Sequence, residues 1–128
     1  MTYLNILFIY LAGIIYSPQP QYDDKANCWA DKDVHFISAY DFQRDGKYLD
    51  PSQTIRIRIE KKHFYFEGNS FDNDTQVPYK DLIKRIDEAS YFNLCILISQ
   101  DEPLGRFNKL GCLLGDKIDD AANIYVIF

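Results

Sequence analysis

The adjacent carboxylates Asp101 and Glu102 are the clearest candidates for chemistry in this chain. They follow Gln100 and the apolar run 94–98, at the expected carboxyl end of a parallel strand, where ligands usually bind in such sheets. Two carboxylates could serve general acid–base catalysis there. Adjacent side chains point in different directions, however, and N-capping of a following helix explains Asp101. We therefore expect no catalytic residue, and keep Gln100, Asp101 and Glu102 as the site of an alternative hypothesis, a small secreted enzyme or inhibitor.

The other residues that could do chemistry predict neither a metal site nor a cofactor. His35 and His63 are the only histidines, and the chain has no C-x-x-C, H-E-x-x-H, G-x-S-x-G or glycine-rich phosphate loop. Carboxylates and amides gather in residues 69–76, but their spacing is not that of an EF-hand, and a polar turn-rich loop accounts for them.

Three cysteines allow one disulfide with one thiol left over in an oxidising compartment. Cys95 lies within the apolar run and Cys112 within a helix-like stretch, so both are interpreted as small buried hydrophobic residues. Cys28 stands in a polar segment and is expected to be the exposed thiol.

Basic residues concentrate in one short span of a chain whose net charge is −5. The candidate partner-binding residues are Arg56, Arg58, Lys61, Lys62 and His63. A solvated strand face would explain them, but they could also dock an acidic segment of a protein partner. If the hairpin that carries them lies at a sheet edge, its unpaired backbone could take up a partner strand or a second copy of the domain.

Hydrophobic periodicity indicates the elements that would position these residues. Ile55, Ile57 and Ile59 alternate with charged residues, which is typical of a half-buried strand. A turn at Lys61–Lys62 leads into a second strand over 63–67. A helix beginning at Pro78, the buried strand 94–98, a helix capped by Asp101 and a final strand over 123–128 follow. On the solvent-exposed face of the first helix, Asp81 and Arg85 have the i,i+4 spacing of an ion pair.

This order, strand–strand–helix–strand–helix–strand, predicts an α+β fold. Each strand–helix–strand unit should cross over right-handed and pair its strands in parallel, and the first two strands should form an antiparallel hairpin. The result is a mixed sheet with both helices on one face. Residues 55–128 are the expected domain, and residues 23–54 are expected to be a linker that could include a strand over 34–39.

Residues 1–22 carry no charged side chain, whereas every Lys, Arg, Asp and Glu follows from Asp23 onward. The apolar run 3–16 spans about 21 Å as a helix, short of the roughly 30 Å hydrocarbon core of a bilayer. We interpret 1–22 as a signal peptide or a short membrane anchor, which predicts a periplasmic or secreted domain or one tethered in the inner membrane. Packing of the run inside a cytoplasmic globule is the third reading.

The acidic balance, with a pI near 4.9, argues against nucleic acid as a partner. The membrane would be contacted only through an uncleaved N-terminal segment.

Four stretches, IRIRIEKKHFYFEGN (55–69), VPYKDLIKRI (77–86), CILISQDEPLG (95–105) and NIYVIF (123–128), together resemble the periplasmic domain of the ExbD/TolR family, which serves proton-driven inner-membrane motors. The resemblance covers about 75 residues and implies an accessory of an envelope transport complex. The family's transmembrane helix carries an essential Asp, whereas residues 1–22 offer only Asn5, which cannot exchange a proton. The sequence therefore predicts an exported or tethered non-enzymatic domain that binds a protein partner, or itself, through a sheet edge.

Overall fold

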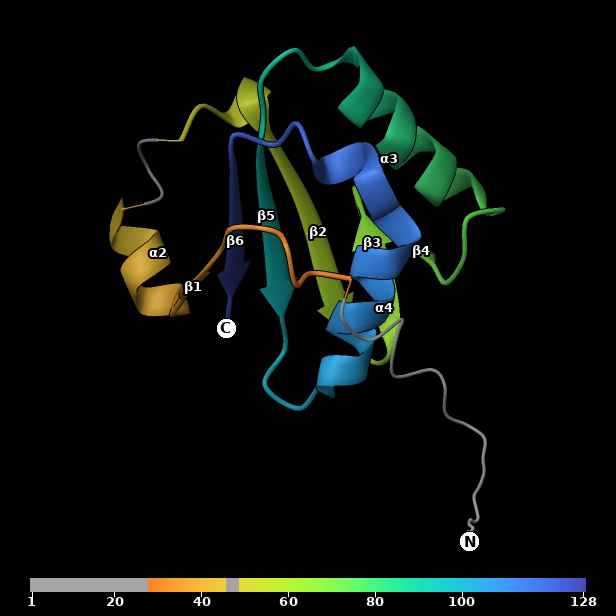
Figure 1. Cartoon of the computed structure of the whole chain (residues 1–128). Helices are drawn as coiled ribbons and strands as arrows, with labels where there is room; N and C mark the ends of the chain where they lie inside the picture. Colours follow the sequence, from red (N-terminus) through yellow and green to blue (C-terminus); the bar gives the residue numbers. More distant parts are fainter. Residues whose placement is uncertain (1–27, 46–48) are drawn as a thin grey trace, which may run out of the picture.

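One mixed sheet of six strands organises the computed structural model, which describes residues 28–45 and 49–128. The interpretation of residues 1–22 lies outside these ranges. Helices α3 and α4 lie together on one side of the sheet, and the short helix α2 lies beyond β6, away from them (Figure 1). The elements in chain order are β1 (Val34–Ile37), α2 (Ala39–Asp45), β2 (Thr54–Glu60), β3 (His63–Phe66), β4 (Asn69–Phe71), α3 (Val77–Glu88), β5 (Asn93–Ile98), α4 (Leu104–Leu114) and β6 (Asn123–Ile127), with 3₁₀ turns at Pro51–Gln53 and Gly115–Ile118.

The strand order in the sheet is β1-β6-β5-β2-β3-β4. Four neighbouring strands, β1, β6, β5 and β2, run parallel, and β2, β3 and β4 form an antiparallel meander. Ile57 of β2 pairs with Ile96 of β5, which pairs with Val126 of β6. The predicted α+β fold with a mixed sheet is confirmed.

Alternation along β2 decides which face of the sheet is buried. Ile55, Ile57 and Ile59 are at most 2% exposed, and the residues between them point to the other face. Full burial of each aliphatic side chain stabilises the fold by roughly 1.5–3 kcal/mol. Helices α3 and α4 cover this face of the sheet and keep these side chains from water (Figure 1). The core side chains that meet it include Phe64, Leu82, Ile86, Leu94, Ile96, Phe107, Leu110, Leu114, Ile124 and Val126.

The segment expected to be a linker contributes to the same sheet. The extra strand is present as β1, which pairs with β6 from Val34 to Ile37. Helix α2 was not predicted; the Ser38 hydroxyl caps it by accepting from the Asp41 backbone N–H at 3.1 Å. The ring of Phe42 lies 6.2 Å from that of Tyr125, which places α2 against the face opposite the core.

Strand β4 occupies part of the region that the sequence predicts to be a loop. Its Phe71 is 1% exposed and pairs with Phe64 of β3, with ring centroids 5.5 Å apart. Burial of this one aromatic side chain stabilises an otherwise polar stretch as the outermost strand of the meander.

The predicted turn at Lys61 and Lys62 is confirmed, and it has an unusual backbone. The φ angles are 53° at Lys61 and 64° at Lys62, and positive values at both central residues are the mark of a two-residue type I′ hairpin turn. Asn and Gly favour this conformation, whereas a side chain such as lysine costs roughly 1–2 kcal/mol per residue in the left-handed region.

We expect the double substitution Lys61→Asn, Lys62→Gly to raise the free energy of unfolding by about 1–2 kcal/mol, because both residues then suit positive φ. Urea unfolding would measure the gain. The matched control, Lys61→Ala with Lys62→Ala, removes the same charges but keeps both Cβ atoms. Equal stability of the two variants would show that charge, not backbone conformation, sets the effect.

An N-terminal arm, residues 28–33, is fixed to helix α4 by three contacts. Cys28 and Cys112 form a disulfide with a Cα–Cα distance of 5.1 Å. The Trp29 indole stacks on Phe107 at 4.7 Å between centroids, and its Nε1 donates to the Phe107 carbonyl at 2.7 Å. The interpretation of Cys28 as an exposed thiol and of Cys112 as a buried hydrophobic residue is therefore wrong, because the two sulfurs are joined.

Close approach of the arm depends on a glycine in α4. A Cβ built on Gly111 would lie 2.6 Å from Trp29 Cε2 and 2.8 Å from Trp29 Cδ1. Only glycine leaves room for the indole at this position.

Candidate protein-docking surface

The predicted basic residues do not lie at a sheet edge. Strand β2 is paired on both sides, with β5 and with β3, and β4 covers the outer side of β3. The predicted edge position of the hairpin is therefore wrong, because its backbone groups are already used in the sheet. Any docking there would use side chains.

Arg56 and Arg58 project from the face of β2 opposite the core, and both are exposed. The Arg58 Nε lies 2.9 Å from Glu60 Oε1, and its guanidinium carbon lies 4.6 Å from the centroid of the Tyr65 ring. These contacts fix Arg58 on its own strand pair. Arg56 forms no ion pair with any residue in the described ranges.

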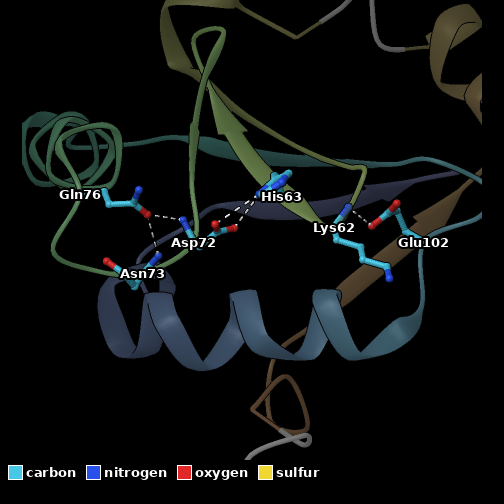
Figure 2. A network of polar contacts seen from close by, with 6 residues as sticks. All are labelled: Lys62, His63, Asp72, Asn73, Gln76 and Glu102. Carbon is cyan, nitrogen blue, oxygen red and sulfur yellow. Dashed lines mark hydrogen bonds and ion pairs between the residues drawn. The ribbon is translucent and has the colours of Figure 1, made fainter.

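His63 and Lys62 belong to a network of polar contacts at the hairpin (Figure 2). His63 Nδ1 lies 3.0 Å from Asp72 Oδ1. The backbone N–H groups of Asp72 and Asn73 both donate to Gln76 Oε1, which closes the loop before α3. The predicted partner-binding residue His63 thus has a local partner that ties β3 to this loop.

The structure brings one residue of the alternative site to the hairpin. Glu102 Oε1 accepts a hydrogen bond of 2.9 Å from the Lys62 backbone N–H, 40 residues away in the chain (Figure 2). Helix α4 begins at Leu104 with Pro103 in the cap position and no side-chain cap, so the predicted capping role of Asp101 is wrong. Gln100 and Asp101 are exposed in the connection from β5, and Glu102 supports the turn.

A free edge that the sequence does not predict lies at the β1 end of the sheet. No described strand pairs with the outer side of β1. The Ile37 carbonyl accepts a hydrogen bond from the Phe128 N–H, and the Ala39 N–H donates to the Phe128 carbonyl. The backbone groups of residues 37 and 39 therefore point toward β6, and those of the alternate residues point away from it. The backbone groups of Val34 and Phe36 therefore point outward, where another extended chain could pair with them.

An aromatic groove runs beside this edge. It has a volume of about 260 Å³, and its walls include Trp29, Val34, Phe36 and Phe107. Phe36 is 61% exposed, although its ring lies 6.2 Å from that of Phe107. The docking edge, as we call β1 together with this groove, thus combines an unpaired backbone with an exposed apolar surface.

The border of the docking edge is acidic. The side chains of Asp31 and Asp33 are 86% and 93% exposed. The intervening Lys32 is only 14% exposed and lies 2.9 Å from Asp119; this hydrogen bond raises the pKa of Lys32. Lys32 Nζ also lies 3.5 Å from Asp31 Oδ1, and His35 Nε2 lies 3.9 Å from Asp33 Oδ2. The carboxylates of Asp31, Asp33 and Asp119 outnumber the one lysine, so the border keeps an excess of negative charge.

The third cysteine offers no reactive group. Cys95 is buried, as predicted, in the centre of the sheet. Burial raises the pKa of its thiol to about 11, partly offset by the charge of Arg56. The thiol is protonated at neutral pH and is a poor nucleophile.

Within the described ranges, no three His, Cys, Asp or Glu side chains are placed to hold a metal ion. No helix of this part is long and apolar enough to cross a membrane. Comparison with known protein families, with curated proteins and with solved structures found no match to this chain.

Proposed function

We propose that the chain is an exported or membrane-tethered protein-interaction domain that captures an extended segment of a partner protein at the docking edge. The observation that carries this proposal is the free side of β1, with Phe36 exposed beside the aromatic groove. Addition of a strand supplies main-chain hydrogen bonds, and a pocket beside the edge selects a side chain.

The partner segment should be apolar and basic. An aliphatic or aromatic side chain would fill the groove between Phe36 and Trp29, and Lys or Arg residues nearby would meet Asp31 and Asp33. Two copies joined edge to edge would instead bring two acidic borders together. Charge therefore favours a different protein over self-association.

Export is supported by the covalent pairing of Cys28 with Cys112, because disulfides persist mainly in oxidising compartments. The uncharged residues 1–22 agree with delivery across or into a membrane. With the ExbD/TolR resemblance, an accessory role in an envelope transport complex is the most specific form of the proposal.

The test uses the oxidised full chain and peptides selected from a display library. We expect selected peptides to be extended, with apolar and basic residues. Phe36→Ala should weaken binding about tenfold, as for a central interface aromatic. Phe36→Pro should abolish it, because proline also removes the outward N–H while leaving the pairing with β6 intact.

Tyr91→Ala is the matched control, since Tyr91 is 51% exposed and lies outside the docking edge. Affinity is measured by fluorescence anisotropy, and folding by thermal unfolding. Unchanged affinity in folded Phe36→Pro would refute strand addition. A dimer in sedimentation that Phe36→Pro dissociates would instead assign the edge to a second copy.

A further inference from the structure

A second pocket, with the opposite charge, lies where β2 begins and β3 ends. It has a volume of about 360 Å³. Strands β5 and β6 separate β2 from β1, so this pocket is distinct from the docking edge. Its apolar lining includes Ile55 and Phe66, which are 2% and 6% exposed.

Two arginines line this pocket, and neither is neutralised. The predicted pair between Asp81 and Arg85 is wrong, because the Arg85 guanidinium instead donates to the Ser52 carbonyl at 2.7 Å. This bond holds Arg85 at the pocket without cancelling its charge. Arg56 lines the same pocket and has no ion pair within the described part of the chain. Glu67 is the one acidic residue of the lining, so cations outnumber carboxylates.

The contrast with two other pockets makes this charge informative. In each of them three aspartates outnumber one lysine. The pocket of about 400 Å³ is lined by Asp31, Asp33, Asp119 and Lys32, with His35, and the pocket of about 300 Å³ by Asp87, Asp116, Asp120 and Lys117. In an acidic protein, a pocket whose lining combines two arginines without ion pairs and buried apolar side chains favours an anion that carries an apolar group.

We propose that this pocket, the arginine pocket, binds a carboxylate and a neighbouring apolar side chain from an acidic segment of a protein. The apolar group would rest on Ile55 and Phe66, and the carboxylate would bridge Arg56 and Arg85. The volume lies at the small end of ligand sites, and suits one or two side chains.

The surface beyond the pocket favours a peptide over a small molecule. Arg58 follows Arg56 on the same exposed face of β2, about 7 Å further along the strand, and is paired there with Glu60. The hairpin lysines, which form no ion pair within the described residues, lie at the end of the strand. A segment anchored in the arginine pocket could therefore place further carboxylates along this row. The predicted docking of an acidic partner thus gains a defined anchor.

The experiment measures binding of a labelled, end-blocked peptide of alternating glutamate and leucine to the oxidised full chain. We expect Arg56→Gln and Arg85→Gln each to weaken binding about fivefold, in line with a partly exposed ion pair. Replacing glutamate by glutamine in the peptide should remove binding, and higher salt should weaken it.

Lys84→Gln is the matched control, because Lys84 is an exposed cation next to Arg85 in α3 but does not line the pocket. An equal loss of peptide affinity in Lys84→Gln and Arg85→Gln would show that only the net charge of the protein matters, and would overturn the proposal. N-acetyl-leucine binding as tightly as the peptide would overturn it in favour of a small-molecule site. A dimer dissociated by Arg56→Gln would overturn it in favour of a second copy.

Arg56 is exposed and forms no ion pair in the described structure, so Arg56→Gln should fold, and thermal unfolding confirms this. Phe36→Pro should bind the acidic peptide normally. Failure of the arginine pocket is thereby distinguished from failure of the docking edge.

Discussion

Gly111→Ala should lower the free energy of unfolding by about 2–3 kcal/mol, as expected when a buried position is overpacked. The new Cβ would lie within 2.8 Å of two ring carbons of Trp29, so the indole must leave its position. That movement breaks the hydrogen bond to the Phe107 carbonyl and the stacking on the Phe107 ring. Alanine favours a helix by only about 1 kcal/mol over glycine, so the steric loss prevails.

Gly105→Ala is the matched control in the same helix. A Cβ at Gly105 meets no atom within 4 Å, so the substitution should leave stability unchanged or raise it by up to about 1 kcal/mol. Urea unfolding followed by Trp29 fluorescence measures both variants. If both glycines tolerate alanine equally, the arm does not depend on this close approach.

The second large effect is expected from loss of the disulfide. Cys28 and Cys112 are 84 residues apart, and a loop of that size should contribute about 4.5 kcal/mol by restricting the unfolded chain. The double variant Cys28→Ser, Cys112→Ser should therefore unfold at a much lower urea concentration than the oxidised protein.

A reductant provides the internal control for this prediction. It should shift the natural chain to the midpoint of the double variant and leave that variant unchanged. Cys95 is buried and has no part in the bond, so its thiol cannot account for the shift. A difference below about 1 kcal/mol would mean that Trp29 and Lys32 hold the arm without the covalent link.

The elements predicted correctly have local signals. Alternation of Ile55, Ile57 and Ile59 identifies β2, and Pro78 marks the first turn of α3. Strands β5 and β6 are continuous apolar runs, and their parallel pairing follows from the intervening helix. Helix α2 also has a local signal that was overlooked, since Ser38 precedes Asp41 with the spacing of a cap.

The errors come from contacts that the local sequence does not specify. Strand β4 depends on burial of Phe71 against Phe64, within an otherwise polar stretch. Pairing of β2 with β5 on one side and of β3 with β4 on the other places the basic hairpin inside the sheet and not at its edge. The edge strands in the described structure are β1 and β4; the sequence predicts β1 only as a possible extra strand and β4 as a loop.

The candidate sites also depend on contacts between residues that are distant in the sequence. The sequence places Glu102 only in the alternative site, and in the structure its carboxylate supports the Lys62 turn across 40 residues. Three cysteines allow three pairings, and the observed one is set by how Trp29 packs against α4. Arg56 is a candidate in the sequence and also lines the arginine pocket, whereas the sequence assigns Arg85 to a helix-surface pair and gives no signal for its place at the pocket.

The bond between Cys28 and Cys112 also decides how the domain would bear a mechanical load. Tension applied through the chain before Cys28 enters helix α4 through the sulfur bridge, so the arm and β1 cannot be peeled away from that end. When the chain is pulled from its two ends, the segment between Cys28 and Cys112 carries no tension, because the bridge joins its ends. Within the described domain, only the residues beyond Cys112 can then be extended. A load on the N-terminal chain would therefore bypass β1, where we propose that a partner segment binds.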